Sequence, residues 1–298
     1  MANSNGWGDG AANNTVGWGQ GANNAIGWGK SHSTSWAGAT DIVGLTTDAD
    51  AQAFITAAAI TDPTQQTAID TLVKGMKTDG IWTKMKAIYP FVGGTATAHK
   101  WNLKDPRDLD AAFRLVFNGG WTHSSTGATP NGTNGWANTY LNPLSVFTAN
   151  DNVHMGYYSR TNVSSATIDM GSAINASGPY LLLQLNVTGS AYYIMNEIAS
   201  YTTAIDSDSR GLFIGSRNGT TVKGFKNSSN VATRTGIVAQ IRPNKNIYLG
   251  AGNLNDVPSN YANRQAAFST IGDGLTDTEA ANLYTRVQAF QTSLSRQV

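Results

Sequence analysis

The N-terminal segment repeats the tripeptide Gly-Trp-Gly, at residues 6–8, 17–19 and 27–29. The last two copies belong to a longer unit, Ala-Asn-Asn-x-x-Gly-Trp-Gly, which begins at Ala12 and again at Ala22. Ordering the backbone of one residue costs about 1–2 kcal/mol, and Gly loses more conformational entropy than any other residue. Because this segment is rich in Gly and Asn, residues 1–40 cannot bury enough apolar surface to fold alone.

The three indoles are the large apolar groups of this arm, and the flanking glycines let another backbone approach them closely. We therefore predict that residues 1–40 dock onto sister subunits or onto another protein of a larger assembly. The residues assigned to this contact are Trp7, Trp18 and Trp28 together with Gly6, Gly8, Gly17, Gly19, Gly27 and Gly29. The alternative is a flexible linker, although linkers favour Ser and other polar residues over regularly spaced Trp.

The composition limits the classes of protein that fit. Charged residues make up 13% of the 298-residue chain, where about 25% is usual. The net charge is +1, without a basic block, so we expect no nucleic-acid partner. There is no Cys, which excludes disulfides, thiolate metal ligands and a Cys nucleophile. We find neither a secretion signal nor an apolar run long enough to cross a membrane, and expect synthesis in a cytoplasm.

Two helices should follow the arm. Asp48 and Asp62-Pro63 have the residue types that begin helices, and apolar side chains then recur on one face of each segment. We predict a helical hairpin and a connecting strand over residues 41–95, with a helical turn over 81–86 and the strand over 87–92.

From residue 96 the pattern changes to short apolar or alternating runs separated by turns, which indicates strands. Along residues 153–159 the alternation directs Met155 and Tyr157 to one face, and His154, Gly156 and Tyr158 to the other. The predicted strands cover residues 112–117, 153–159, 166–170, 180–187, 191–195, 212–216, 222–225, 237–241, 247–250 and 266–271.

The chain ends with a helix that begins at the capping box Thr276–Glu279 and carries Leu283, Val287, Phe290 and Leu294 in a stripe. Many strands without helices between them favour an antiparallel sheet arrangement. We therefore predict a mainly β fold, with a jelly-roll or concanavalin-like β-sandwich over residues 96–298 whose C-terminal helix covers one sheet.

Four features taken together resemble virion proteins of tailed phages that infect Bacteroidetes. They are the Gly-Trp-Gly arm, residues 61–66 (Thr-Asp-Pro-Thr-Gln-Gln), residues 88–94 (Ile-Tyr-Pro-Phe-Val-Gly-Gly) and residues 275–280 (Leu-Thr-Asp-Thr-Glu-Ala). The region after about residue 96 is similar to concanavalin-like lectin sandwiches of the LamG type. The resemblance implies an appendage, fibre or head-decoration protein, typically a homotrimer located in the virion, and it supplies no set of ligand residues.

The sequence lacks a recognisable catalytic constellation. Glycosidases need two carboxylates at a fixed separation, and of the two Glu residues Glu279 is explained by its helix cap, which leaves Glu197 alone. The four His residues lie far apart, and no Gly-x-Ser-x-Gly motif is present. We therefore expect no catalytic residues, no enzyme activity and no cofactor. Calcium is the metal to consider, with Asp206, Asp208 and Asp256 as candidate ligands.

Two segments place indoles among the polar side chains that stack on and hydrogen-bond to sugars. The candidate glycan contacts are Trp121, His123, Trp136 and Asn138. The alternative is that Trp121 and Trp136 pack at the edge of the sandwich. The function expected from the sequence is a virion structural protein, anchored by its arm, that displays a lectin-like sandwich for host-glycan adhesion. A virion depolymerase or glycosidase, or a structural component without a ligand, are the alternatives.

Overall fold

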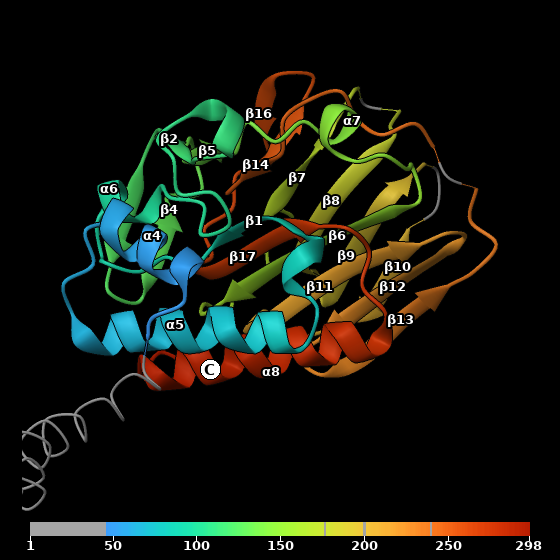
Figure 1. Cartoon of the computed structure of the whole chain (residues 1–298). Helices are drawn as coiled ribbons and strands as arrows, with labels where there is room; N and C mark the ends of the chain where they lie inside the picture. The colour runs from blue at the N-terminus through green and yellow to red at the C-terminus, as the bar shows by residue number, and fades with distance from the viewer. Residues whose placement is uncertain (1–45, 176, 199–200, 239) are drawn as a thin grey trace, which may run out of the picture. The chain divides into compact units, whose positions relative to one another are not determined.

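The computed structural model describes residues 46–175, 177–198, 201–238 and 240–298. Asp48–Val298 form one compact unit. Within it two antiparallel sheets pack face to face, so the predicted mainly β sandwich is confirmed (Figure 1). The predicted boundary between residues 95 and 96 falls inside this unit, because the helices and the sandwich share one hydrophobic cluster.

We call the first sheet the helix-covered sheet. Its strands lie side by side in the order β13 (Ser229–Arg234), β12 (Thr221–Lys226), β11 (Gly211–Asn218), β6 (Asn152–Ser159), β17 (Ala266–Gly272), β4 (Gly127–Pro130) and β3 (Trp121–Ser124). A further strand, β1 (Met85–Tyr89), also pairs with β17.

We call the second sheet the open sheet. Its strands lie side by side in the order β10 (Thr202–Ile205), β9 (Ser190–Glu197), β8 (Tyr180–Val187), β7 (Met170–Ala173), β14 (Tyr248–Leu249), β5 (Trp136–Asn138) and β2 (Val116–Asn118). The strand β15 (Gly252–Leu254) pairs with β7 in parallel and with β16 (Val257–Ser259) in antiparallel orientation.

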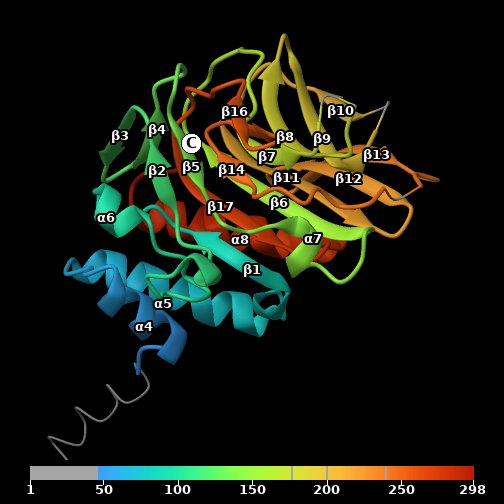
Figure 2. The ribbon, with the colours of Figure 1, turned by 90° about the horizontal axis from the view of Figure 1, so that it is seen from above.

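Helices cover the outer face of the first sheet. α5 (Pro63–Thr78) and α8 (Asp277–Ser293) lie side by side along it, and α4 (Ala49–Ala57) packs beside α5 (Figures 1 and 2). Asp48 and Asp62 cap their helices as predicted, and Thr276 and Glu279 form the predicted capping box. Gly75 permits the close helix contact, because a Cβ there would lie 2.7 Å from Arg286 Cδ. The remaining short helices are η4 (Trp82–Lys84), α6 (Ala96–His99), η5 (Asp110–Ala112) and α7 (Pro143–Val146).

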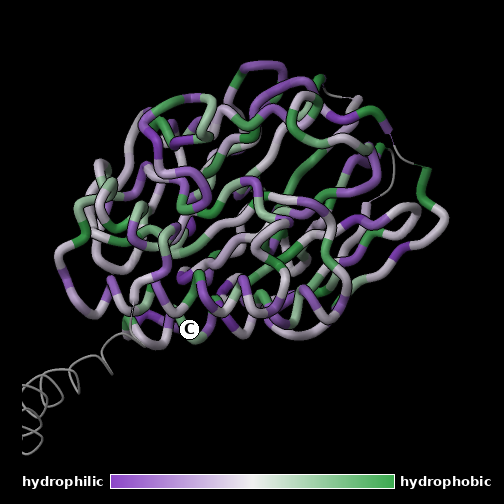
Figure 3. The backbone as a smooth tube through the Cα atoms, in the orientation of Figure 1, coloured by the Kyte–Doolittle hydropathy of each residue, from purple (hydrophilic) through white to green (hydrophobic). Residues whose placement is uncertain are grey.

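Two large hydrophobic clusters build this arrangement. One joins the helices to residues such as Tyr158, Ile214 and Phe268 of the helix-covered sheet, and the other fills the space between the sheets with residues such as Met155 and Tyr157. The alternation predicted along residues 153–159 is thereby confirmed. Figure 3 shows hydrophobic and hydrophilic segments alternating along α5 and α8, as expected when one helix face packs against a sheet. No helix in the described residues is long and apolar enough to cross a membrane.

Four strand predictions were wrong in part or in full. The strand predicted over residues 87–92 runs from Met85 to Tyr89 instead, because Pro90 has no backbone N–H and Phe91 adopts a left-handed conformation (φ 48°). In residues 112–117 the left-handed conformation of Phe113 (φ 59°) delays the strand to Val116. In residues 166–170, Ile168 forms only an isolated bridge with Tyr261, and β7 begins only at Met170. Residues 237, 238, 240 and 241 form no strand, because Ile237 instead donates its N–H to Thr220 and accepts a hydrogen bond from Arg217.

Candidate functional site

The outer face of the open sheet carries the candidate site. In this sheet Leu183 pairs with Met170, and both side chains enter the core between the sheets. The neighbouring pair, Leu182 and Gly171, therefore faces outward. Leu182 forms a small outer cluster with Ile168 and Ile194, to which no residue of α4, α5 or α8 contributes. None of these three helices therefore packs on this cluster of the outer face.

Three aromatic rings, which we call the tyrosine cluster, gather over β8, β9 and the start of β10. Tyr201 meets Tyr180 edge-to-face at 5.9 Å between ring centroids, and it meets Tyr192 at 6.5 Å. Tyr201 is 37% exposed, while the other two rings are half-buried. Burial, followed by the neighbouring Tyr180, raises the pKa of the Tyr201 hydroxyl. The Tyr201 phenol therefore remains a neutral hydrogen-bonding group near neutral pH.

A second group, the Trp–Tyr cluster, lies on β5 and β14. The rings of Trp136 and Tyr248 are 4.2 Å apart and inclined by 33°, and Asn138 stands directly opposite Tyr248 in the strand register. Trp136 and Asn138 are half-buried, whereas Tyr248 is buried beneath its neighbours. Burial, helped by the charge of Asp256, raises the pKa of Tyr248. The cluster offers a partly exposed indole next to an amide.

A cavity of about 230 Å³ opens on the same face, beside the tyrosine cluster. Its lining includes Tyr180, Leu182, Ile168, Gly252 and Asn260. Gly252 is needed here, since a Cβ would lie 2.6 Å from Ile168 Cδ1. Larger cavities of about 440 and 660 Å³ adjoin α8, but Phe290, the one aromatic residue lining either of them, is buried. The open sheet therefore combines a cavity with partly exposed rings.

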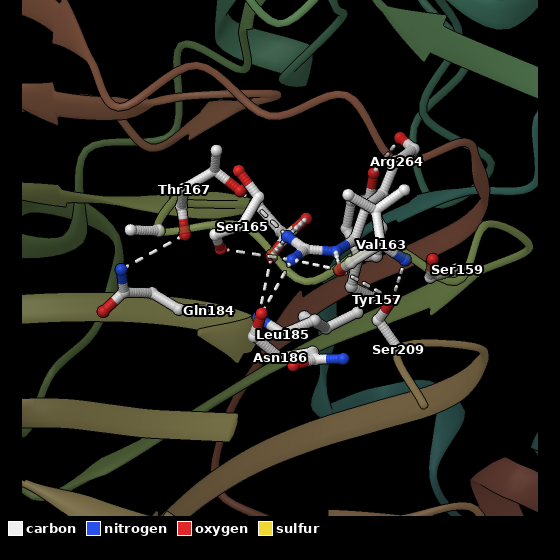
Figure 4. Close-up of polar contacts among 12 residues, drawn as sticks. Tyr157, Ser159, Val163, Ser165, Thr167, Gln184, Leu185, Asn186, Ser209 and Arg264 are labelled. Atoms are coloured by element: carbon white, nitrogen blue, oxygen red, sulfur yellow. Dashed lines mark hydrogen bonds and ion pairs between the residues drawn. The ribbon is translucent and has the colours of Figure 1, made fainter. Parts of the chain in front are cut away.

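A buried arginine fixes the segment that carries Ile168 (Figure 4). Arg264 and Asp169 form a fully buried ion pair with N–O distances of 2.9–3.0 Å. The same guanidinium donates to the carbonyls of Val163, Ser165 and Asn186. Burial raises the pKa of Asp169, and the charge of Arg264 opposes that shift. This network joins residues 163–169 to β8 and thus holds one wall of the cavity.

The structure separates the four predicted glycan contacts. Trp136 and Asn138 lie on the outer face of the open sheet, but Trp121 and His123 belong to β3 of the other sheet. The indole N–H of Trp121 donates to the carbonyls of Asn118 and Trp136, and its ring packs into the core between the sheets. Trp121 therefore has the packing role that was its alternative interpretation, and we withdraw it as a glycan contact.

His123 is also corrected, because it pairs with another histidine. Its Nδ1 lies 2.9 Å from Nδ1 of His99, so one ring donates and the other accepts. The two rings pack among Phe91, Phe117 and Trp121. Burial lowers the pKa of His99 to about 3, with a further contribution from His123, and burial lowers the pKa of His123 as well. Both rings are therefore neutral at pH 7.

The calcium candidates do not converge. Asp206 forms an ion pair with Lys226 at 2.6 Å, Asp208 forms one with Arg210 at 2.8 Å, and Asp256 forms one with Lys245. Within the described ranges, no group of three or more His, Asp or Glu residues is arranged to hold a metal ion. The carboxylates are engaged by cations instead, and we withdraw this ligand set.

The two glutamates have structural partners. Glu279 closes the α8 cap and also pairs with Lys84 at 2.6 Å. Glu197 is 1% exposed and pairs with Arg234 at 2.6 Å, while burial raises its pKa. The predicted assembly residues Trp7, Trp18 and Trp28 and their glycines lie outside the described residues, so that assignment stays a prediction.

Reasoning from the sequence missed Tyr180, Tyr192, Tyr201 and Tyr248 as site residues. The first two occupy outward positions of strands that were predicted correctly, at Tyr180–Val187 and Ser190–Glu197. Alternation separates inward from outward side chains, so it would have placed Tyr192 on the face of β9 that does not carry the buried Tyr193. It does not reveal which sheet lies uncovered.

The chain matches no protein-family model and no curated protein. Among solved structures it is similar to a mutant of Trypanosoma rangeli sialidase displaying trans-sialidase activity, with 10% identity, a TM-score of 0.48, and coverage of 77% of this chain and 39% of that one. It is also similar to a mutant of NanB sialidase from Streptococcus pneumoniae, with 13% identity, a TM-score of 0.42, and coverage of 55% and 27%. A third structure is the CBM40 domain of Ruminococcus gnavus IT-sialidase bound to α2,3-sialyllactose, with 12% identity, a TM-score of 0.35, and coverage of 44% and 80%.

These matches contradict our expectation that the chain is not an enzyme, since the structures that resemble it include a sialidase and a trans-sialidase. That expectation is therefore withdrawn. The chain spans about a quarter to two fifths of the two sialidases. At 10–13% identity the likeness concerns the β-sandwich fold alone and assigns neither an activity nor a residue role to this chain.

Proposed function

We propose that the sandwich binds carbohydrate through the outer face of its open sheet. The observation that carries this proposal is the presence of two aromatic clusters on the sheet face to which α4, α5 and α8 contribute no packing. Aromatic rings present an apolar surface that matches the C–H face of a sugar, and nearby amides and hydroxyls bond to its hydroxyl groups. Tyr192 and Trp136 are the central residues of the proposed contact.

The test is a glycan array probed with the full chain, followed by calorimetry on the glycans that bind. Tyr192→Ala should weaken binding at least about tenfold, because it removes one stacking surface. Tyr284→Ala is the matched control, since Tyr284 is also a half-buried aromatic residue but belongs to α8 and the helix-side cluster. Absence of saturable binding, or equal losses in both variants, would refute the proposal. Reducing ends measured in the same samples distinguish binding alone from binding with cleavage.

We also propose that the chain is a virion component of a tailed phage and that residues 1–40 attach it to the particle. The support is the repeated Gly-Trp-Gly pattern, together with a compact unit at Asp48–Val298 that has its own hydrophobic clusters. A chain lacking residues 1–45 should fold, bind glycan and fail to join particles. Incorporation of the truncated chain at normal copy number would exclude the anchoring role, and particle symmetry would establish whether the protein is a trimer.

A further inference from the structure

Among the described residues, the outward positions of the open sheet are held by aromatic, aliphatic and uncharged polar residues, apart from Glu197, which stands opposite Tyr180 in the strand register and is 1% exposed. The uncharged positions include Val116, Asn118, Trp136, Asn138, Gly171, Ala173, Tyr180, Leu182, Gln184, Ser190, Tyr192, Ile194, Thr203, Ile205 and Tyr248. Two ion pairs lie near these rings: the charge of Asp256, paired with Lys245, acts on the pKa of Tyr248, and that of Glu197, paired with Arg234, acts on the pKa of Tyr201. A carboxylate on a ligand would therefore lose its water and meet only cations that already have a carboxylate partner.

The amide side chains of this face keep free groups that suit sugar hydroxyls. Asn118 Nδ2 donates to the Val116 carbonyl at 2.9 Å, and Gln184 Nε2 donates to the Thr167 carbonyl at 3.1 Å. Asn138 Oδ1 accepts from the Tyr140 N–H at 2.9 Å. In the described part of the chain no hydrogen bond occupies Asn118 Oδ1, Gln184 Oε1 or Asn138 Nδ2. Each amide is thus oriented by one bond and retains an uncharged donor or acceptor.

The two aromatic clusters are separated across the sheet. The strand order β9-β8-β7-β14-β5 places Tyr192 at one end and Trp136 at the other, with Gly171 on β7 between them. Neighbouring strands lie about 4.8 Å apart, so β8 and β14, which carry Tyr180 and Tyr248, are about 10 Å apart, and β9 and β5, which carry Tyr192 and Trp136, are about 19 Å apart. One pyranose ring is too small to touch both clusters, whereas an oligosaccharide lying across the strands reaches both.

Resting on the proposed function, we infer that this face selects an uncharged oligosaccharide that spans both aromatic clusters, and that it discriminates against sialylated and uronate-containing glycans. The uncharged outward positions supply the discrimination, and the spacing of Tyr192 and Trp136 supplies the length requirement. Between the clusters the Leu182 side chain covers Gly171, since its Cδ2 would lie 2.7 Å from a Gly171 Cβ, so the central part of the ligand would meet an apolar surface.

The experiment measures affinity on neutral oligosaccharides of one to six units, drawn from the array glycans that bind, and on the same glycans carrying sialic acid or uronic acid. Binding should tighten at least about tenfold between the monosaccharide and the tetrasaccharide. Trp136→Ala and Tyr192→Ala should each remove most of that gain, while Tyr284→Ala should not. Because no ion pair forms, affinity should change less than about twofold between low and high salt.

The outcomes separate the two proposals. If acidic glycans bind as well as or better than neutral ones, and Tyr192→Ala weakens that binding, the carbohydrate-binding function stands and the uncharged-ligand inference is overturned. If the monosaccharide binds as tightly as the tetrasaccharide, the spanning geometry is overturned. If no member of the array binds saturably, the proposed function itself fails and the inference fails with it.

Discussion

The two outer faces of the sandwich have opposite chemistry, although both belong to antiparallel sheets of the same chain. The helix-covered sheet presents residues such as Leu212, Ile214 and Phe268, and α5 and α8 close over them (Figure 1). The open sheet presents rings beside amides, and its outer hydrophobic cluster has three buried members, Ile168, Leu182 and Ile194. The comparison shows that the sheet face covered by helices is apolar and closely packed, whereas the other face combines aromatic rings with oriented hydrogen-bonding groups.

The largest expected effect comes from truncating one aromatic residue on each face. Phe290 on α8 is 3% exposed and meets Phe268 edge-to-face at 5.8 Å, so Phe290→Ala should lower the free energy of unfolding by about 3–5 kcal/mol. It should leave glycan affinity unchanged. Tyr192→Ala should cost about 1 kcal/mol of stability or less, since that ring is half-buried, and should reduce affinity instead. Urea denaturation and calorimetry measure both quantities. Equal stability losses in the two variants would remove the distinction between the faces.

An intermediate effect is expected from acid, because the buried histidines belong to α6 and β6 and not to the open sheet. Burial lowers the pKa of His99 to about 3 and that of His154 to about 4. Since each histidine has an ordinary pKa of 6.5 when unfolded, the unfolded state takes up protons first as the pH falls below 6.5. Each histidine should therefore lower the free energy of unfolding by about 2 kcal/mol between pH 7 and pH 5.

The control for this pH dependence is His99→Phe, which suits the aromatic surroundings of that ring. The variant should show a shallower loss of stability between pH 7 and pH 5 than the original chain, as followed by urea denaturation at each pH. An identical slope in both proteins would mean that His99 is not held neutral by burial.

The smallest effect is expected at the charged pair beside the open face. Lys245 pairs with Asp256, whose side chain is 66% exposed, and such exposed pairs contribute about 1 kcal/mol or less to stability. Lys245→Met should therefore change neither the unfolding midpoint appreciably nor the affinity for neutral glycans. A marked loss of glycan affinity in Lys245→Met would show that charge takes part in recognition, and the open face would then not bind glycan through uncharged groups alone.

Local patterns were sufficient to predict much of the fold. The caps at Asp48, Asp62 and Thr276 act through backbone groups within one helical turn, so the residues near each cap determine where the helix begins. The long strands β6, β8 and β11 were predicted because their apolar runs are continuous or alternate regularly. Short strands such as β5 and β15 have three residues each and depend on partners distant in sequence.

The candidate site was predicted only in part, for the same physical reason. Trp136, Asn138 and Trp121 were all identified from the polar composition of the segments around them. The indole N–H of Trp121, however, donates to two backbone carbonyls, and its ring packs into the core between the sheets. Asp206 and Asp208 had the residue types of a calcium site, but the β12 residue Lys226 meets them in space. Residue type indicates which chemistry is available, and the three-dimensional partners decide whether it is used.

The sequence by itself determined the β-rich class, the helix starts and the alternation along the long strands, because these depend on interactions between near neighbours. Only the tertiary structure decided which sheet the helices cover, and therefore which tyrosines lie outward and exposed. Strand alternation gives each strand two faces without saying which one meets a helix. That choice depends on contacts between elements far apart in the sequence, such as the ion pair at 2.7 Å between Asp79 at the end of α5 and Arg286 of α8, which are 207 residues apart.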